Sequence, residues 1–371
     1  MKKKILFGTA KIGISAAILA WLAIQAHRNA VFTDLAARPK HWGLLASAAA
    51  VCFAAVMITF VRWYYLVRAL DLPFTLREAI RLGFLGFLFN LAPMGIVGGD
   101  LLKAVVLARK QPGHRAEAVA TVLVDRIIGL YVLFLVASAA IGLTGLWQNP
   151  VLEVQVVCKL TWVITAVGTA AVVLPLFAGL TGGNVTGLIG RLPYAGETAQ
   201  RLLGAVRVYR RRFGVLILSA LMTVPVHCLF AVAVYMIAIA LYDPVLPLGT
   251  HFVVVPLSAS TAVLPIPMGP FEAVLDRLYA VVPLPNGGLM AAGQGLVVAL
   301  AYRVVTVLIA AVGMFYYLGS RREVSEMMHS AELEEEAGLK TGPEVRLEAG
   351  SETGPEVNEK PHRRSALVQS P

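Results

Sequence analysis

The chain has 371 residues, of which 58% are hydrophobic and 15% charged, and its mean hydropathy is +0.74. An average soluble domain carries about 25% charged residues, so this composition excludes an ordinary soluble enzyme. It also excludes a disordered chain, a disulfide scaffold and a coiled coil. Apolar runs of membrane-spanning length recur as far as Gly319, which predicts an all-α integral membrane protein.

The formal net charge is +10, and the charges are distributed unevenly along the chain. Residues 1–319 contain 25 Lys and Arg against 11 Asp and Glu, whereas 320–371 hold the other 11 acidic residues. The basic excess indicates loops at an anionic lipid surface, and no nucleic-acid partner is expected. We therefore expect a polytopic membrane domain at 1–319 and an acidic, mostly disordered cytoplasmic tail at 320–371.

The first apolar run follows three lysines at positions 2 to 4 and extends to Ala26. It is longer than the apolar region of a signal peptide, so it predicts an uncleaved helix that begins in the cytoplasm. Five more full spans bring the expected number to about six. They are Trp42–Val61, Ala118–Leu146, Val156–Leu180, Val215–Leu241 and Gly288–Leu318.

The connections between the apolar runs fall into two groups by their content of Lys and Arg. The basic group, with 17 such residues, consists of 1–4, 62–81, 100–116 and 182–213. The other group, with 4, consists of 27–41, 147–155, 242–251 and 270–287. Because basic loops stay inside, the first group and both chain termini are expected in the cytoplasm of a bacterial cell, with the protein in its plasma membrane.

Two further apolar stretches, Leu82–Gly99 and Phe252–Gly269, are interrupted by Pro and Gly. Each has both flanks in the same group of connections, so each is expected to enter the membrane and return on the same side. Non-helical backbone at membrane depth is tolerated only where it is buried in protein or lines a wet cavity. Two such re-entrant elements from opposite faces predict a polar path near the membrane midplane.

The two interrupted stretches also resemble each other. Each contains Pro-Met-Gly, then a carboxylate (Asp100 or Glu272), and then a span with an embedded arginine (Arg126 or Arg303). Corresponding interrupted segments in two halves predict an inverted-repeat transporter. The turns are expected to act as gates, through Asn90, Pro93, Gly95, Gly98, Gly99, Pro265, Pro267 and Gly269.

Several charged residues lie where a membrane helix should be apolar. Arg303 lies midway along its span, at a cost of ~2.5–3.5 kcal/mol, so a carboxylate, helix carbonyls, water or a ligand phosphate must stabilise it. A structural ion pair remains the alternative to a functional role. The residues expected to contact a head group are Arg303, Arg126, Lys103, Asp125, Asp100 and Glu272.

Spacing predicts some of the partners of these residues. Asp125 and Arg126 are adjacent and about 100° apart on a helix, so they do not face each other, whereas Asp100 and Lys103, three apart, share a face. Asp100 and Glu272 have an alternative role as helix N-terminal caps. Arg277 is the expected nearby partner of Glu272.

No sequence motif points to a metal or another cofactor. The chain has three cysteines, all far apart within apolar runs, and it contains no CxxC, HExxH, P-loop or GxSxG pattern. Buried structural roles are expected for Cys52, Cys158 and Cys228. We expect no cofactor and no enzyme activity.

Two segments resemble a known family. Phe89–Pro93 and Gly98–Lys103, followed by Ala120–Leu130, resemble the first signature of the lysylphosphatidylglycerol synthase transmembrane (flippase-like) family, and Leu264–Glu272 resembles its second. Members commonly have Glu-Arg where this chain has Asp125-Arg126. The resemblance covers the membrane part only, without an aminoacyl-transferase domain.

The resemblance implies a protein that moves lipids between leaflets. The expected substrate is an anionic or aminoacylated phospholipid or a polyprenyl-phosphate-linked lipid, with a separate synthetase or glycosyltransferase as partner. Two alternatives stay open. One is an intramembrane transferase with Asp100 or Glu272 as general base, and the other is a cell-envelope scaffold that uses the acidic tail.

Overall fold

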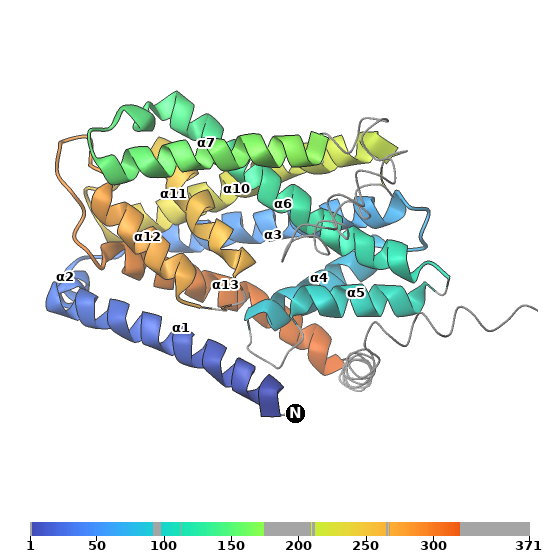
Figure 1. The fold of residues 1–371 in the computed structure, drawn as a ribbon. Helices are drawn as coiled ribbons and strands as arrows, with labels where there is room; N and C mark the ends of the chain where they lie inside the picture. The colour runs from blue at the N-terminus through green and yellow to red at the C-terminus, as the bar shows by residue number, and fades with distance from the viewer. Residues whose placement is uncertain are drawn as a thin grey trace, which may run out of the picture. The chain divides into compact units, whose positions relative to one another are not determined.

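The computed structural model describes residues 2–91, 98–111, 113–173, 209, 212–264, 266 and 268–319, and every regular element within them is helical (Figure 1). Five of the helices are long and apolar enough to cross a membrane, which confirms the all-α membrane class. They are α3 (Trp42–Arg68), α6 (Arg115–Thr144), α7 (Leu152–Val173), α10 (Phe213–Leu241) and α13 (Gln294–Gly319).

The first expected span corresponds to α1 (Lys2–Arg28), which is not among these five helices. Its side chains are described from Gly13 onward, and its role as a span stays a prediction. The remaining elements are shorter. They are α2 (Val31–Ala37), α4 (Leu76–Leu91), α5 (Gly99–Lys110), α11 (Leu248–Ser260), α12 (Pro270–Val281) and the 3-10 turns η1 (Leu146–Gln148) and η4 (Thr261–Val263).

Local signals explain where two of the long helices begin and end. α6 ends at Thr144 and not at Leu146, because Gly145 follows in the left-handed conformation with φ 68°. α13 begins at Gln294 and not at Gly288. There the carboxylate of Asp276 accepts hydrogen bonds from the backbone N–H groups of Gly293 (2.8 Å) and Leu296 (3.0 Å), and so caps the helix from a neighbouring element.

The two interrupted stretches form helical hairpins. α4 packs against α5 and α11 packs against α12, and the four helices have 12 to 16 residues each. At 1.5 Å per residue they are about 18–24 Å long, shorter than a hydrocarbon core of about 30 Å. The second helix of each hairpin begins inside the protein, since Gly99 and Glu272 are buried. This geometry supports the re-entrant paths, whose relation to a membrane stays a prediction.

The helix packing supports an inverted repeat. α3 and α10 run antiparallel along each other: the N–H of His41 donates to Ala240 O (3.3 Å) at one end, and Arg62 contacts Thr223 nearer the other. α4 packs on α13, and α11 packs on α6. Each hairpin therefore packs on the long helix that follows the other hairpin, as expected for two halves, α3–α6 and α10–α13, related by a two-fold axis.

Contacts between connections agree with the grouping by basic residues. Within the described residues, polar contacts join connections of the same group. The two groups lie at opposite ends of α3. The contacts are Asp71–Arg212 (2.6 Å) and Glu78–Lys110 (2.8 Å) in the basic group, and Glu153–Arg277 (2.6 Å) and Arg38 to the carbonyl of Asp243 (3.4 Å) in the other. Which end faces the cytoplasm stays a prediction.

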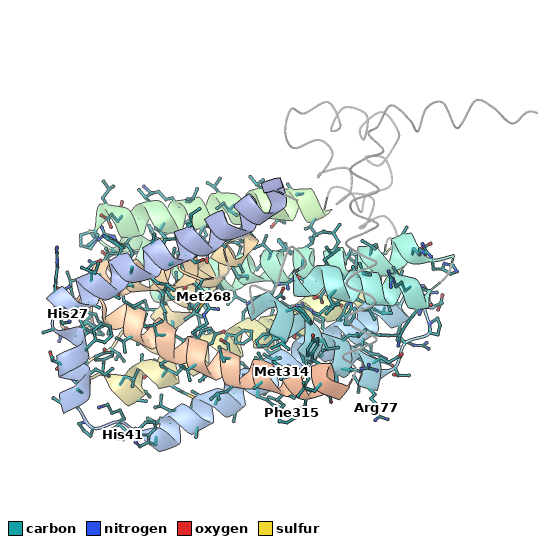
Figure 2. The ribbon with its side chains drawn as sticks, turned by 90° about the horizontal axis from the view of Figure 1, so that it is seen from below. His27, His41, Arg77, Met268, Met314 and Phe315 are labelled. Carbon is teal, nitrogen blue, oxygen red and sulfur yellow. The ribbon has the colours of Figure 1, made fainter. Side chains whose placement is uncertain are left out.

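The outer surface of the helices is apolar. Figure 2 shows Met314 and Phe315 on the outward side of α13, and Phe315 is 77% exposed. Large hydrophobic side chains are exposed on other long helices as well, Trp42, Leu143 and Val163 among them. A soluble monomer rarely exposes so much apolar surface, so these faces are suited to contact lipid.

Some predictions fall outside the described residues. They concern Pro93, Gly95, Pro265 and Pro267 of the expected gates and the tail at 320–371. The boundary between the membrane domain and that tail therefore stays a prediction.

Candidate functional site

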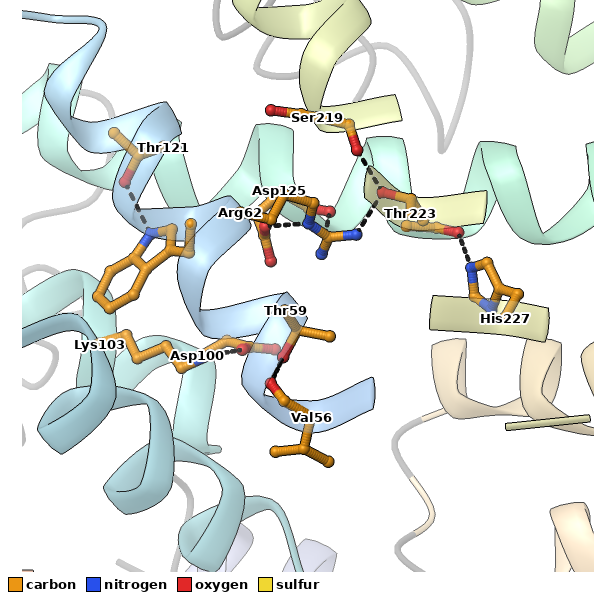
Figure 3. Close-up of polar contacts among 12 residues, drawn as sticks. Val56, Thr59, Arg62, Asp100, Lys103, Thr121, Asp125, Ser219, Thr223 and His227 are labelled. Carbon is orange, nitrogen blue, oxygen red and sulfur yellow. Dashed lines mark hydrogen bonds and ion pairs between the residues drawn. The ribbon is translucent and has the colours of Figure 1, made fainter. Parts of the chain in front are cut away.

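Five charged side chains form a first charge cluster, defined here as Arg62, Asp100, Lys103, Asp125 and Arg126. Figure 3 shows the first four of them. Asp100, in the first turn of α5, forms an ion pair with Arg126 of α6. Its Oδ1 also lies 3.7 Å from Lys103 Nζ. The shared face predicted for Asp100 and Lys103 is present. Asp125 and Arg126 have different partners, as their adjacent positions require.

The sequence interpretation missed Arg62. Its side chain is buried, and its Nε donates to Asp125 Oδ1 (2.9 Å) while one terminal nitrogen donates to the hydroxyl of Thr223 (2.7 Å). Figure 3 shows the guanidinium between these two partners. The sequence predicts Arg62 in a connection, because the predicted span ends at Val61. α3 instead continues to Arg68, which places Arg62 inside the helix.

Lys103 has few partners for a charged group that is only 13% exposed. Besides Asp100, its ammonium lies 5.3 Å from the centre of the Trp63 ring, a cation–π arrangement. The indole N–H of Trp63 donates to the Thr121 hydroxyl (3.3 Å), which fixes the ring between α3 and α6. The aromatic face thus partly replaces water around this ammonium.

The alternative role of Asp100 as an N-cap is wrong. Gly98 is the N-cap residue of α5 and offers no side chain. The side-chain oxygen of Asn90, from α4, accepts from the Gly99 N–H at 2.8 Å. Asn90 of α4 therefore caps a free N–H group at the start of α5. The Asp100 carboxylate does not take part in this capping and forms ion pairs instead.

The second charge cluster consists of Glu272 and Arg303. Glu272 is fully buried, and its Oε1 accepts from Arg303 Nε (2.9 Å) and from a terminal nitrogen (2.6 Å). Its other oxygen accepts from the Gly269 N–H (2.8 Å), so Glu272 caps α12 from the third helical position. The N-cap residue itself, the role predicted for Glu272, is Gly269. The guanidinium also lies 5.9 Å from the centre of the Phe271 ring.

The predicted partner of Glu272, Arg277, is wrong. Five residues along a helix correspond to about 140°, so the two side chains leave α12 on different faces. Arg277 pairs instead with Glu153 at the surface (2.6 Å). The partner of Glu272 comes from α13, which packs on α12.

The two clusters occupy corresponding places in the two halves. In each half a carboxylate in the first turn of the second hairpin helix pairs with an arginine of the long helix that follows. They differ in accessibility. The side chains of Arg126 and Asp100 are 52% and 32% exposed, whereas those of Arg303 and Glu272 are 19% and 0% exposed. The Asp100–Arg126 pair is therefore accessible, whereas the Glu272–Arg303 pair is largely closed.

The family described as lysylphosphatidylglycerol synthase TM region matches residues 8–313 of the chain. The chain belongs to this family. The matched region contains both hairpins and both charge clusters, and the membership indicates a membrane protein with a lipid-related function. No curated protein and no solved structure was found to match the chain.

Proposed function

We propose that this member of the lysylphosphatidylglycerol synthase TM region family moves a lipid head group across the plasma membrane of a bacterium while the acyl chains stay in the bilayer. The substrate class is an anionic or aminoacylated phospholipid or a polyprenyl-phosphate-linked lipid. The observation that carries the proposal is the pair of internal carboxylate–arginine contacts, Asp100–Arg126 and Glu272–Arg303, at hairpins that enter from opposite ends.

A head group that crosses the bilayer needs protein groups that replace the water molecules around its charge. A charged head group that enters hydrocarbon loses its hydration, and this cost is several kcal/mol. Arginine suits a phosphate because its planar guanidinium donates two parallel hydrogen bonds to the phosphate oxygens. The carboxylates of Asp100 and Glu272 occupy these donors and keep the arginines paired. A phosphate takes the place of the carboxylate when it arrives.

The difference in exposure indicates the order in which a head group meets the two ion pairs. The Asp100–Arg126 pair is accessible, so a head group that enters from the basic end of the protein meets Arg126 first. The second pair, Glu272–Arg303, has to open before the head group leaves at the other end. Asn90, Gly98, Gly99 and Gly269 adjoin these pairs and are the described members of the expected gates. The sequence contains no nucleotide-binding motif, so net movement would use a gradient or a partner protein.

Reconstitution tests the proposal. The full chain is placed in liposomes with a fluorescent phosphatidylglycerol, and loss of fluorescence to an impermeant reductant measures movement between leaflets. We expect Arg126→Gln and Arg303→Gln to slow movement at least about ten-fold, since each removes a charge-assisted contact worth about 1.5–3 kcal/mol. Arg277→Gln, which removes a surface ion pair, is the matched control and should retain the wild-type rate.

The same liposomes separate the alternatives. A transferase would leave covalently altered lipid, which mass spectrometry of the extracted lipids detects. A scaffold would lose its function when residues 320–371 are deleted and would tolerate Arg303→Gln. Wild-type rates in both folded arginine variants would contradict the transport proposal.

A further inference from the structure

The first charge cluster contains one more cation than anion. Arg62 is matched by Asp125, with the Thr223 hydroxyl as a further acceptor. Lys103 and Arg126 both pair with a single carboxylate, that of Asp100. The other charges of the cluster all act electrostatically on Lys103. One positive charge is therefore left uncompensated within the cluster.

The second charge cluster lacks this excess. Arg303 and Glu272 match one to one, and the second carboxylate oxygen is held by the Gly269 N–H. The position on α13 that corresponds to Asp125, directly before the arginine, is Tyr302. The excess charge is therefore a property of the first half of the protein and does not follow from the repeat.

The excess charge is costly because Lys103 is largely buried. A buried ammonium is costly unless it is paired and hydrogen-bonded, and Lys103 has a carboxylate oxygen at 3.7 Å and an aromatic ring as partners. An anion with one negative charge would neutralise the cluster. Arg126, whose side chain is 52% exposed, contacts the same carboxylate as Lys103, so an anion that binds Arg126 from the exposed side lies beside the pair that Lys103 belongs to.

From this charge balance, and resting on the proposed transport function, we infer that the first charge cluster selects lipids with a single net negative charge, carried by a phosphodiester, and that Lys103 determines this selectivity. A zwitterionic lipid leaves the excess positive charge in place. A lysyl-substituted lipid, with a net positive charge, adds to it. Both are therefore disfavoured in a site of low dielectric, where like charges repel strongly.

The test compares lipids that differ in net charge. The full chain in detergent is titrated with phosphatidylglycerol, phosphatidylethanolamine or lysylphosphatidylglycerol, and the rise in the thermal midpoint gives the apparent affinity. Inorganic phosphate and glycerophosphoglycerol are the lipid-free probes. We expect phosphatidylglycerol to bind at least about ten-fold more tightly than the other two lipids, and the lipid-free probes to bind weakly.

Variants assign the selectivity to Lys103. Lys103→Gln removes the excess charge, so the preference for phosphatidylglycerol over phosphatidylethanolamine should fall to about two-fold or less. Lys103→Arg keeps the charge and should retain the preference. Lys159→Gln makes the same change at an exposed position on α7 and should also retain it.

Three results would overturn the inference: equal affinity of the wild type for lysylphosphatidylglycerol, an unchanged preference in Lys103→Gln, or lipid-free phosphate that binds as tightly as the lipid. The transport assay is read separately. Selective binding without movement between leaflets contradicts the proposed function and leaves the anion site. Movement without a preference for the monoanionic lipid contradicts the inference and leaves the proposed function.

Discussion

Two arginines inside the helical unit, Arg62 and Arg303, have carboxylate partners that lie on other helices. Arg303 pairs with Glu272, which is fully buried and holds a backbone N–H with its second oxygen. Removing one partner of a buried pair leaves the other charge uncompensated, and this costs more than the pair itself contributes to stability.

We expect Arg303→Met to lower the free energy of unfolding by about 3–5 kcal/mol, because Glu272 loses its counter-charge in a buried site. Denaturant unfolding in detergent measures the change. The double variant Glu272→Gln/Arg303→Met should recover most of the loss, since the amide oxygen of Gln still accepts from the Gly269 N–H. A loss below 1 kcal/mol in the single variant would show that the pair is not buried as described.

Arg62 gives a comparison of buried and exposed ion pairs within one chain. Arg62→Met removes the side-chain donor that the described residues provide to Asp125, and also the contact with Thr223, so a loss of about 3–5 kcal/mol is expected. Arg38→Met breaks the pair with Asp34, in which both side chains are about 40% exposed, and should cost at most about 1 kcal/mol. Equal losses, measured by the same unfolding method, would contradict the burial of Arg62.

At the scale of elements, close approach of backbones holds the first hairpin together. A Cβ at Gly99 would overlap the carbonyl oxygen of Gly86, so only glycine allows α4 and α5 to approach this closely. The adjacent Gly98 differs: its φ of −66° suits any residue, and a Cβ there would lie 3.7 Å from its nearest neighbour, the Asn90 side-chain oxygen.

Substitution by alanine should destabilise the protein at Gly99 and leave its stability almost unchanged at Gly98. Gly99→Ala should destabilise the protein by about 1–3 kcal/mol or more, because the two helices must separate. Gly98→Ala should change stability by no more than about 0.5 kcal/mol. Thermal midpoints of the two variants in detergent check the pair, and a tolerant Gly99 would contradict the contact at Gly86.

The ion pair Glu78–Lys110 joins the first turn of α4 to the end of α5, and its contribution to stability depends on pH. Burial raises the pKa of Glu78, but hydrogen bonds from Lys110 and Thr75 and the charge of Lys110 outweigh it and hold this pKa below its ordinary value. A carboxylate with a lowered folded-state pKa stabilises the protein above the unfolded pKa of about 4.3 and loses this contribution as the pH falls through the folded value.

Glu78→Gln should therefore lower stability slightly at pH 7, by at most about 1 kcal/mol, because the pair is partly exposed. The difference between the wild type and the variant should disappear below about pH 4. Thermal midpoints between pH 7 and pH 3.5 measure it. A difference that does not change with pH would show that the charge of Glu78 is not responsible.

At the scale of the whole helical unit, the grouping of connections predicts sidedness. In a background with Cys52, Cys158 and Cys228 changed to alanine, we expect Asp71→Cys to react with an impermeant thiol reagent from the cytoplasm only. Glu153→Cys should react from the outside only. Both positions are exposed and lie at opposite ends. Reaction of both from one side would contradict the two-ended arrangement, and a reversed result would contradict the orientation.

Residue types and their order along the chain are enough to predict the class of protein, the grouping of the connections and the likeness of the two interrupted stretches. Composition and apolar run length report these directly, since the bilayer imposes a fixed length and a positive-inside bias. Helix spacing was also enough to predict that Asp100 and Lys103 share a face and that Asp125 and Arg126 do not.

Which charged side chains form pairs depends on how the helices pack. Arg62 was hidden because the predicted span ended at Val61, whereas α3 continues to Arg68. Glu272 pairs with Arg303 instead of Arg277 because the partner comes from another helix, 31 positions away. Asn90 caps α5 across the hairpin for the same reason. Pairing between helices depends on the packing of the two halves against each other, and spacing along one helix carries no information about that packing.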